Sequence, residues 1–225
     1  MGRRPFVVRL WLRRRVAHVL WTWGRRCFTL RVMPARLRRY DQPGDSHFWT
    51  ISCRRRLTFF HDDGLKRIVA DGLRVLQHRF GVCLIGYVIM PEHVHVIVYP
   101  HARRNDDPIP VSKLLHAFKK HVGFHGKQRL REVWRIQGGL WSQPLNAWAT
   151  GDKNEQTIWN VRGYDFNVRA QKTLLQKLDY CHKNPLTRAL VDRAEDWLWS
   201  SYRYYEFGDQ SVLKMDWDGS WPIIW

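Results

Sequence analysis

The stretch Gly86-Tyr-Val-Ile-Met-Pro-Glu-His-Val-His-Val-Ile-Val98 decides the fold of this 225-residue chain. Its first half belongs to an apolar run, Val82 to Met90, that is rich in β-branched residues and stops at Pro91. In its second half, His93 to Tyr99, successive residues alternate between two faces in the manner of a strand, with three valines on one face. Two strands joined by so short a segment predict an antiparallel hairpin that turns at Met90-Pro91-Glu92.

On both sides of this hairpin the spacing of apolar residues predicts further strands and helices. Alternation predicts one strand before it, and apolar residues three and four positions apart predict three helices. The strand is Ser46 to Cys53, and the helices are Asp62 or Asp63 to about Phe80, Val111 to Val122, and about Ala170 to Asn184, where Pro185 would stop the last one. The order β-α-β-β-α plus a further helix predicts an α+β sandwich with an antiparallel sheet. Residues 123–165 allow no assignment beyond short strand-like pieces such as Thr157 to Val161.

Composition excludes several classes of protein. With 44% hydrophobic residues the chain can bury a core, so it is not disordered. No apolar run approaches the roughly 18 residues of a membrane helix. The cysteines form no Cys-x-x-Cys pair, which argues against a zinc ribbon, a redox motif and a disulfide framework; they are Cys27, Cys53, Cys83 and Cys181. We expect a protein of the reducing cytoplasm.

The net charge of +18 is distributed unevenly. Residues 1–40 hold twelve arginines and no acid, which leaves +6 for residues 41–225. Residues 1–32 are therefore a basic extension. They fit a basic arm for nucleic acid, an amphipathic surface helix, a transit peptide, or a misassigned start with translation beginning at Met33.

His93 and His95 form the sharpest chemical feature. Residues two apart on a strand point to the same face, about 7 Å apart, so two imidazoles can converge on one divalent cation while Val94 faces the core. The alternative is a pair of solvent-facing or hydrogen-bonded histidines without a role in metal binding. Two histidines are only part of a metal site, and a third ligand must come from elsewhere.

The last predicted helix offers such a ligand. On a wheel of about 100° per residue with Leu178 at zero, Tyr180 lies at roughly 200° and Asn184 at roughly 240°, opposite the leucines. The phenol and the amide oxygen therefore project together, with Gln176 and Lys183 beside them. The alternative is a surface tyrosine and an asparagine that caps the helix. His182 points away from Tyr180 and is expected to be structural.

Three motifs, Gly86 to Val98, Tyr180-Cys-His-Lys-Asn-Pro185 and Trp199-Ser-Ser-Tyr202, resemble those of the single-tyrosine HUH transposases, in which U is a hydrophobic residue. Within that family the chain is most similar to the REP-associated tyrosine transposases, relatives of the insertion-sequence 200/605 transposases. The resemblance covers roughly Pro34 to Tyr205.

The resemblance implies a ferredoxin-like α/β sandwich with a separate helix that carries the nucleophile. His93 and His95 would bind Mg²⁺ or Mn²⁺, Asn184 would be the third metal ligand, and Tyr180 would attack single-stranded DNA near a hairpin to give a 5′-phosphotyrosine. The candidate DNA contacts are Lys113, Lys119, Lys120, Lys183 and Gln176, although a solvated helix face is the default reading of such lysines.

The implied transposase domain is 33–205, with a Trp- and Gly-rich insertion at about 125–166 and a tail at 206–225. The insertion exceeds what compact members of the family carry, and its tryptophans would fill a satellite core or stack on bases. We expect a monomer or homodimer with no membrane association, in the bacterial cytoplasm and associated with the nucleoid. A histidine-triad hydrolase is disfavoured because Ile97 replaces the third histidine. Another HUH nickase, a replication initiator or relaxase, and a domesticated hairpin-binding protein remain alternatives.

Overall fold

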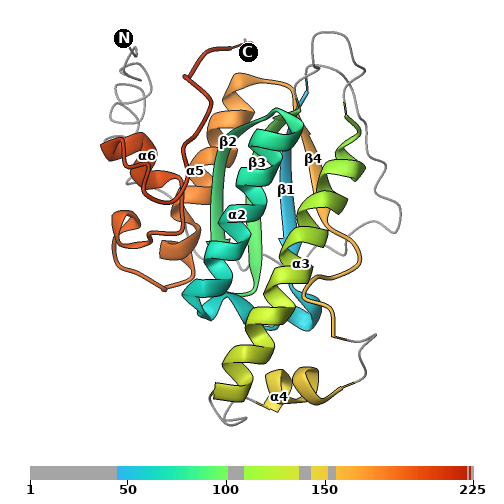
Figure 1. Ribbon diagram of the computed structural model, residues 1–225. Helices are drawn as coiled ribbons and strands as arrows, with labels where there is room; N and C mark the ends of the chain where they lie inside the picture. Colours follow the sequence, from blue (N-terminus) through green and yellow to red (C-terminus); the bar gives the residue numbers. More distant parts are fainter. Residues whose placement is uncertain (1–44, 101–108, 137–142, 152–155, 222, 224–225) are drawn as a thin grey trace.

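The computed structural model describes residues 45–100, 109–136, 143–151, 156–221 and 223, so the basic extension lies outside the described residues. Within these ranges a four-stranded antiparallel sheet has the order β2-β3-β1-β4 (Figure 1). Its strands are β1 (Ser46–Ser52), β2 (Val82–Met90), β3 (His93–Pro100) and β4 (Tyr164–Val168). The helices are α2 (Asp63–Phe80), α3 (Val111–Ile136), α4 (Gln143–Thr150), α5 (Gln171–Thr187) and α6 (Tyr202–Phe207), with short 3₁₀ turns η1 (Arg54–Arg56), η2 (Phe59–His61) and η3 (Ala194–Asp196).

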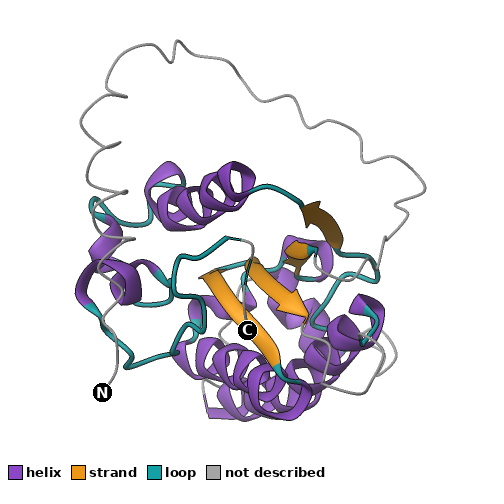
Figure 2. Cartoon of the chain, turned by 90° about the horizontal axis from the view of Figure 1, so that it is seen from above, coloured by secondary structure: helices purple, strands orange, loops and turns teal. Residues whose placement is uncertain are grey.

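The predicted α+β class is confirmed, with helices on both faces of the sheet. Helices α2 and α3 pack together on one face, and α5 lies on the other (Figure 2). Phe48 and His95 contact Tyr180 on α5, and strand side chains alternate, so Val94 and Val96 point toward α2 and α3. Both valines are fully buried, as expected for Val94.

The predicted hairpin is present, and its register places the histidines on the inner strand β3, next to the hairpin turn. Met90 pairs with His93 in the hairpin. On the other side of β3, His93 and His95 pair with Ser52 and Thr50 of β1. Because β3 has a neighbour on each side, its backbone is held firmly and the direction of both imidazoles is fixed.

Helix boundaries follow local signals, with one exception. Asp62 caps α2 by accepting a hydrogen bond from the Leu65 backbone N–H at 2.8 Å, and Gly81 ends that helix with a φ of 63°. The prediction that Pro185 stops α5 was wrong, since α5 continues to Thr187. A proline in the last turn removes one backbone hydrogen bond without ending the helix, and Pro185 is itself buried.

Residues 123–168 contain secondary structure that could not be predicted from the sequence. Helix α3 continues to Ile136, and β4, which was not predicted, adds a strand beside β1. The strand-like piece around Thr157 to Val161 contributes a single bridge between Trp159 and Cys53. Trp148 and Trp159 are buried, which agrees with the core-packing interpretation for these two residues.

The C-terminal part of the described chain covers the outer edge of β2. Three backbone hydrogen bonds join the two: Ile89 N–H to Trp199 O (2.8 Å), Ser201 N–H to Tyr87 O (3.0 Å) and Asp216 N–H to Leu84 O (2.8 Å). The Trp199-Ser-Ser-Tyr202 motif therefore completes the sheet edge. In the described ranges no helix is long and apolar enough to cross a bilayer.

Candidate active site

His93 and His95 face each other across a short gap. Their Nε2 atoms are 3.0 Å apart, and both side chains are almost completely buried. The Nδ1 atom of His93 lies 3.2 Å from Oε1 of Glu92, and that of His95 lies 2.9 Å from Oγ1 of Thr50. If each Nδ1–H donates to its oxygen, the two Nε2 lone pairs point at each other.

This geometry fits a divalent cation. Two ligands at right angles in an octahedral shell, each about 2.1 Å from the metal, are about 3.0 Å apart. Burial, together with the nearby charges of His93 and Lys177, holds the pKa of His95 well below its usual range. The neutral imidazole is the form that binds metals, so the lowered pKa suits His95 to that role.

Helix α5 places Tyr180 against this pair. The ring centroids of Tyr180 and His95 are 5.1 Å apart in an edge-to-face contact, and Tyr180 is 49% exposed. Burial raises the pKa of the Tyr180 phenol, whereas its hydrogen bond with Asn184 acts in the opposite direction. The phenol is thus beside the histidines and open to a substrate.

Asn184 sits one turn after Tyr180 and is buried. It lies inside α5, whose C-cap is Arg188, so Asn184 is not the helix cap. Among the described residues no third His, Cys, Asp or Glu completes a metal cluster with the histidine pair. The amide oxygen of Asn184 is therefore the candidate for a further protein ligand.

Glu92 is a site residue that the sequence analysis left out. The residue is 6% exposed, and its carboxylate contacts Nδ1 of His93, Nη2 of Arg56 (3.1 Å) and Nη2 of Arg188 (2.8 Å). The hydrogen bond with His93 and the two arginines lower the pKa of Glu92 to about 2. Its position just before His93 was a usable signal, but nothing in the sequence pairs Arg56 with Arg188.

Lys177 is a second residue that the sequence did not single out. Its Nζ lies 4.7 Å from the ring centre of Phe48 and 4.8 Å from that of Phe166. Phe48 in turn stacks on His95, with ring centroids 5.3 Å apart. Desolvation lowers the pKa of Lys177. A cation thus stands one turn before Tyr180, at the same site.

The residues proposed for DNA contact are spread over two helices. Gln176 is exposed on α5, and Lys183 is exposed there in an ion pair with Asp179. On α3, which lies across the sheet from α5, Lys113 and Lys120 are exposed. Lys119 donates to the backbone carbonyls of Asn160 and Val161 at 2.9 and 3.2 Å.

His182 has the structural role that was expected. It is buried, and its Nε2 lies 3.0 Å from Oγ of Ser201. This contact ties α5 to the Trp199-Ser-Ser-Tyr202 motif.

Comparison with known proteins identifies the family. Residues 45–161, more than half of the chain, match the family described as "Transposase IS200 like". The chain belongs to this IS200-like transposase family. The matched residues include His93 and His95 and end before α5. Tyr180 and Asn184 lie outside the matched residues, so their assignment rests on the geometry given above.

A relative from Haemophilus influenzae, whose provisional name is REP-associated tyrosine transposase, is 21% identical over 185 residues, or 81% of this chain and 93% of that protein. A solved structure of a REP-associated tyrosine transposase bound to a REP hairpin has 21% identity and a TM-score of 0.55. It covers 82% of this IS200-like chain and 91% of the other. That structure supports the fold.

Proposed function

We propose that this IS200-like transposase is a metal-dependent single-tyrosine enzyme that cleaves and rejoins single-stranded DNA near hairpins through a 5′-phosphotyrosine. The observation that carries the proposal is the edge contact of the half-exposed Tyr180 with the buried His95. A nucleophile that stands beside a metal-binding pair is the arrangement that phosphoryl transfer needs.

His93, His95 and Asn184 would hold Mg²⁺ or Mn²⁺, which when bound would polarise the scissile phosphate. The Tyr180 oxygen attacks phosphorus, and the bond from phosphorus to the 3′ oxygen breaks. The phenolic proton passes to solvent, which reaches the exposed ring, and the leaving 3′ oxygen takes up a proton. The reverse reaction rejoins a strand, because the phosphotyrosine bond retains the energy of the bond that was broken.

Three positive side chains near Tyr180 and the histidine pair support this proposal. Lys177 stands one turn before Tyr180, and Arg56 and Arg188 are about half exposed while each contacts Glu92. The remaining N–H groups of both guanidinium groups can donate to phosphate oxygens. These contacts would hold the strand in place for attack by Tyr180.

The hairpin part of the proposal comes from the relatives, one of which was solved with a REP hairpin bound. We assign the catalytic domain to 33–205 and regard 1–32 as an additional basic segment. The tail from 206 contributes Leu213, Met215 and Trp217 to the core, so its described part packs on the catalytic domain.

The test is formation of a covalent protein–DNA adduct. Labelled single strands from both flanks of the gene are incubated with the protein and Mg²⁺ or Mn²⁺, then separated on a denaturing gel. We expect a metal-dependent adduct that Tyr180→Phe abolishes while hairpin binding persists, because only the attacking oxygen is removed. Tyr204→Phe, on α6, is the matched control and should retain the adduct.

Two outcomes would overturn this proposal. Hairpin binding without an adduct on either flank would favour a domesticated DNA-binding protein. An adduct that persists in Tyr180→Phe would place the nucleophile elsewhere.

A further inference from the structure

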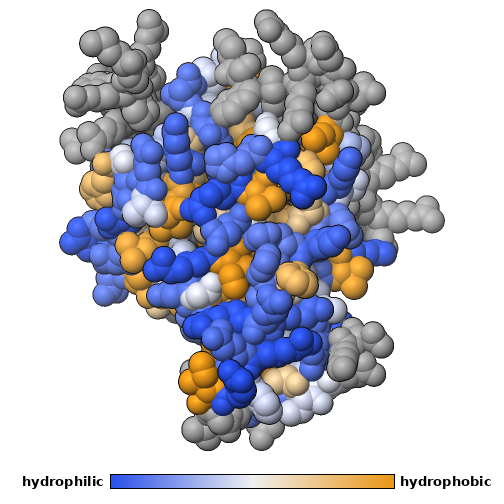
Figure 3. Space-filling model, in the orientation of Figure 1, coloured by the Kyte–Doolittle hydropathy of each residue, from blue (hydrophilic) through white to orange (hydrophobic). Residues whose placement is uncertain are grey.

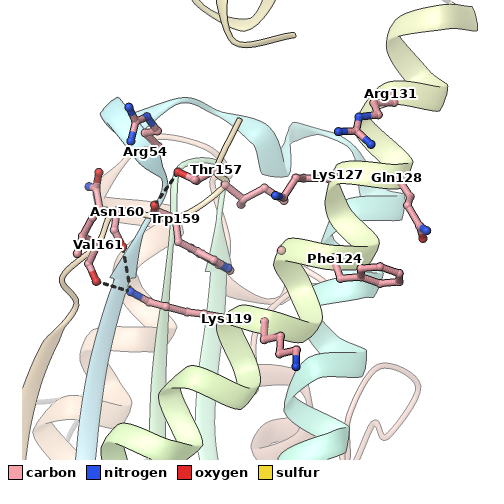
Figure 4. Close-up of a pocket in the computed structure, with 13 residues that line it drawn as sticks. Arg54, Lys119, Phe124, Lys127, Gln128, Arg131, Thr157, Trp159, Asn160 and Val161 are labelled. Carbon is pink, nitrogen blue, oxygen red and sulfur yellow. Dashed lines mark hydrogen bonds between the residues drawn. The ribbon is translucent and has the colours of Figure 1, made fainter. Parts of the chain in front are cut away.

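A basic cavity of about 740 Å³ lies between the middle part of α3 and the segment 156–161, at the end of the sheet where β1 stops (Figure 4). Five cationic side chains line it and no acidic one does; the five are Arg54, Lys119, Lys120, Lys127 and Arg131. Figure 3 shows hydrophilic residues gathered over the lower part of α3. The volume is that of a site for a ligand of nucleotide size, and the charge demands an anionic one.

The five cations differ in how they are engaged. Lys119 is used to hold Asn160 and Val161, and Arg131 donates to Oε1 of Gln156 at 3.2 Å. Within the part of the chain that the structure describes, Lys120 and Lys127 have neither a hydrogen bond nor an ion pair. Lys127 points from α3 across the cavity toward Thr157 (Figure 4). These two lysines are available to bind phosphate groups.

Aromatic groups accompany the charges. Trp159 is 7% exposed at the cavity, and its indole N–H has no acceptor among the described residues. Phe124 on α3 is 60% exposed at the rim, where a base can stack on it.

A short backbone connection joins this cavity to the active site. The Cys53 N–H donates to the carbonyl of Glu92 at 2.9 Å, while the next N–H, of Arg54, donates to Ile158 in the cavity wall at 2.7 Å. Arg54 therefore lies at the cavity and Arg56 at Glu92. Arg56 has a φ of 58°, a conformation that is costly for a non-glycine residue and that the surrounding contacts hold in place.

We propose that this cavity binds a second segment of the same DNA single strand whose scissile phosphate lies at Tyr180, with phosphates on Lys120 and Lys127 and a base against Phe124. The inference rests on the proposed function. The arginine-rich residues 1–40 are excluded as occupants by their charge. A strand with regularly spaced phosphates and bases matches both the cations and the exposed aromatic ring, whereas an acidic peptide matches only the cations.

The test measures binding of a fluorescein-labelled single strand of twenty thymidines in EDTA, so that tyrosine chemistry does not contribute. The double variant Lys120→Gln/Lys127→Gln should bind roughly tenfold more weakly than wild type. The slope of log affinity against log salt should decrease by about 1.4, since each lost phosphate contact contributes about 0.7 for single strands. The charge-matched control Lys172→Gln/Lys214→Gln alters two exposed lysines outside the cavity and should stay near wild type.

A third variant, Phe124→Ala, tests the base contact. It should weaken binding severalfold without altering the salt slope, because it removes stacking and no charge. The proposal is overturned if the Lys120/Lys127 variant and its control bind the oligonucleotide equally. It is also overturned if oligoglutamate occupies the cavity and the oligonucleotide does not.

The adduct assay separates this inference from the proposed function. Cavity-dependent binding without any adduct would uphold the cavity and refute the transposase chemistry. An adduct in wild type, with binding unchanged in the cavity variants, would uphold the transposase chemistry and refute the cavity as a binding site.

Discussion

The guanidinium Nη2 of Arg188 lies 2.8 Å from Oε1 of Glu92. This ion pair joins the residue after α5 to the turn before β3, and Glu92 also contacts His93. The helix that carries Tyr180 is therefore fastened to the strand that carries the histidines by a buried carboxylate. The position of Tyr180 relative to the histidine pair therefore depends on that charge as well as on apolar packing.

Replacing Glu92 with Gln keeps the shape and removes the charge. We expect Mn²⁺ affinity to decrease about tenfold, because groups that orient a histidine ligand commonly contribute that much. Isothermal titration calorimetry measures the change. Glu195→Gln, which alters a carboxylate on η3 that pairs with Arg193, is the control. Equal affinities in the two variants would show that Glu92 does not orient His93.

Thr50→Val removes the oxygen that lies 2.9 Å from Nδ1 of His95. Valine fits a strand, so β1 should persist while the imidazole loses its orientation. A lost buried hydrogen bond of about 1 kcal/mol corresponds to roughly fivefold weaker Mn²⁺ binding. Titration followed by electron paramagnetic resonance measures this. Thr50→Ser keeps the hydroxyl and should restore affinity; failure to do so would point to packing instead.

His95→Ala should make strand cleavage insensitive to added Mn²⁺, because it removes half of the histidine pair. Cleavage is measured across a Mn²⁺ titration. The control is His125→Ala, which removes an exposed histidine of α3 and should leave the titration as in wild type. A normal Mn²⁺ response in His95→Ala would refute the metal assignment.

Asn184 can be tested by exchanging its oxygen. Asn184→Ala should weaken Mn²⁺ binding by tenfold or more, whereas Asn184→Asp keeps an oxygen ligand and should bind at least as tightly as wild type. Calorimetry measures the Mn²⁺ affinity of both variants, and circular dichroism checks that each is folded. If both variants lose affinity equally, the residue serves packing and not coordination.

Gly86→Ala tests how closely α5 approaches β2. A methyl group there would lie 2.5 Å from Cδ1 of the buried Leu178, so we expect a loss of about 1–3 kcal/mol in the free energy of unfolding by urea. Adding Leu178→Val should recover part of that loss. Strict additivity of the two changes would mean that the side chains do not collide.

The sequence alone was sufficient to predict the strands and helices that depend on neighbouring residues. Alternation predicted β1 and β3, spacing predicted α2, and the helix wheel predicted that Tyr180 and Asn184 share a face. Those signals depend on residues at most a few positions apart. This is why the hairpin and the histidine pair could be located before the fold was known.

The remaining features depend on contacts between distant residues. Strand β4 is only five residues long and half-buried, so it has little alternation to detect. Glu92 becomes a site residue only because Arg56 and Arg188, 36 and 96 positions away, meet there. The basic cavity combines Arg54 with α3 and the segment 156–161, a region whose composition gave no periodic signal.

The strip of chain from Trp199 to Asp216 has a consequence for association with other molecules. An outermost strand with free N–H and C=O groups is a template onto which another chain can add, which leads to strand exchange or aggregation. On β2 the N–H of Ile89 and the carbonyls of Tyr87 and Leu84 are already bonded to the chain's own later residues. A second copy cannot add a strand beside β2 unless this segment is first displaced. A protein truncated after α5 would expose an unpaired strand edge to which another chain can bind.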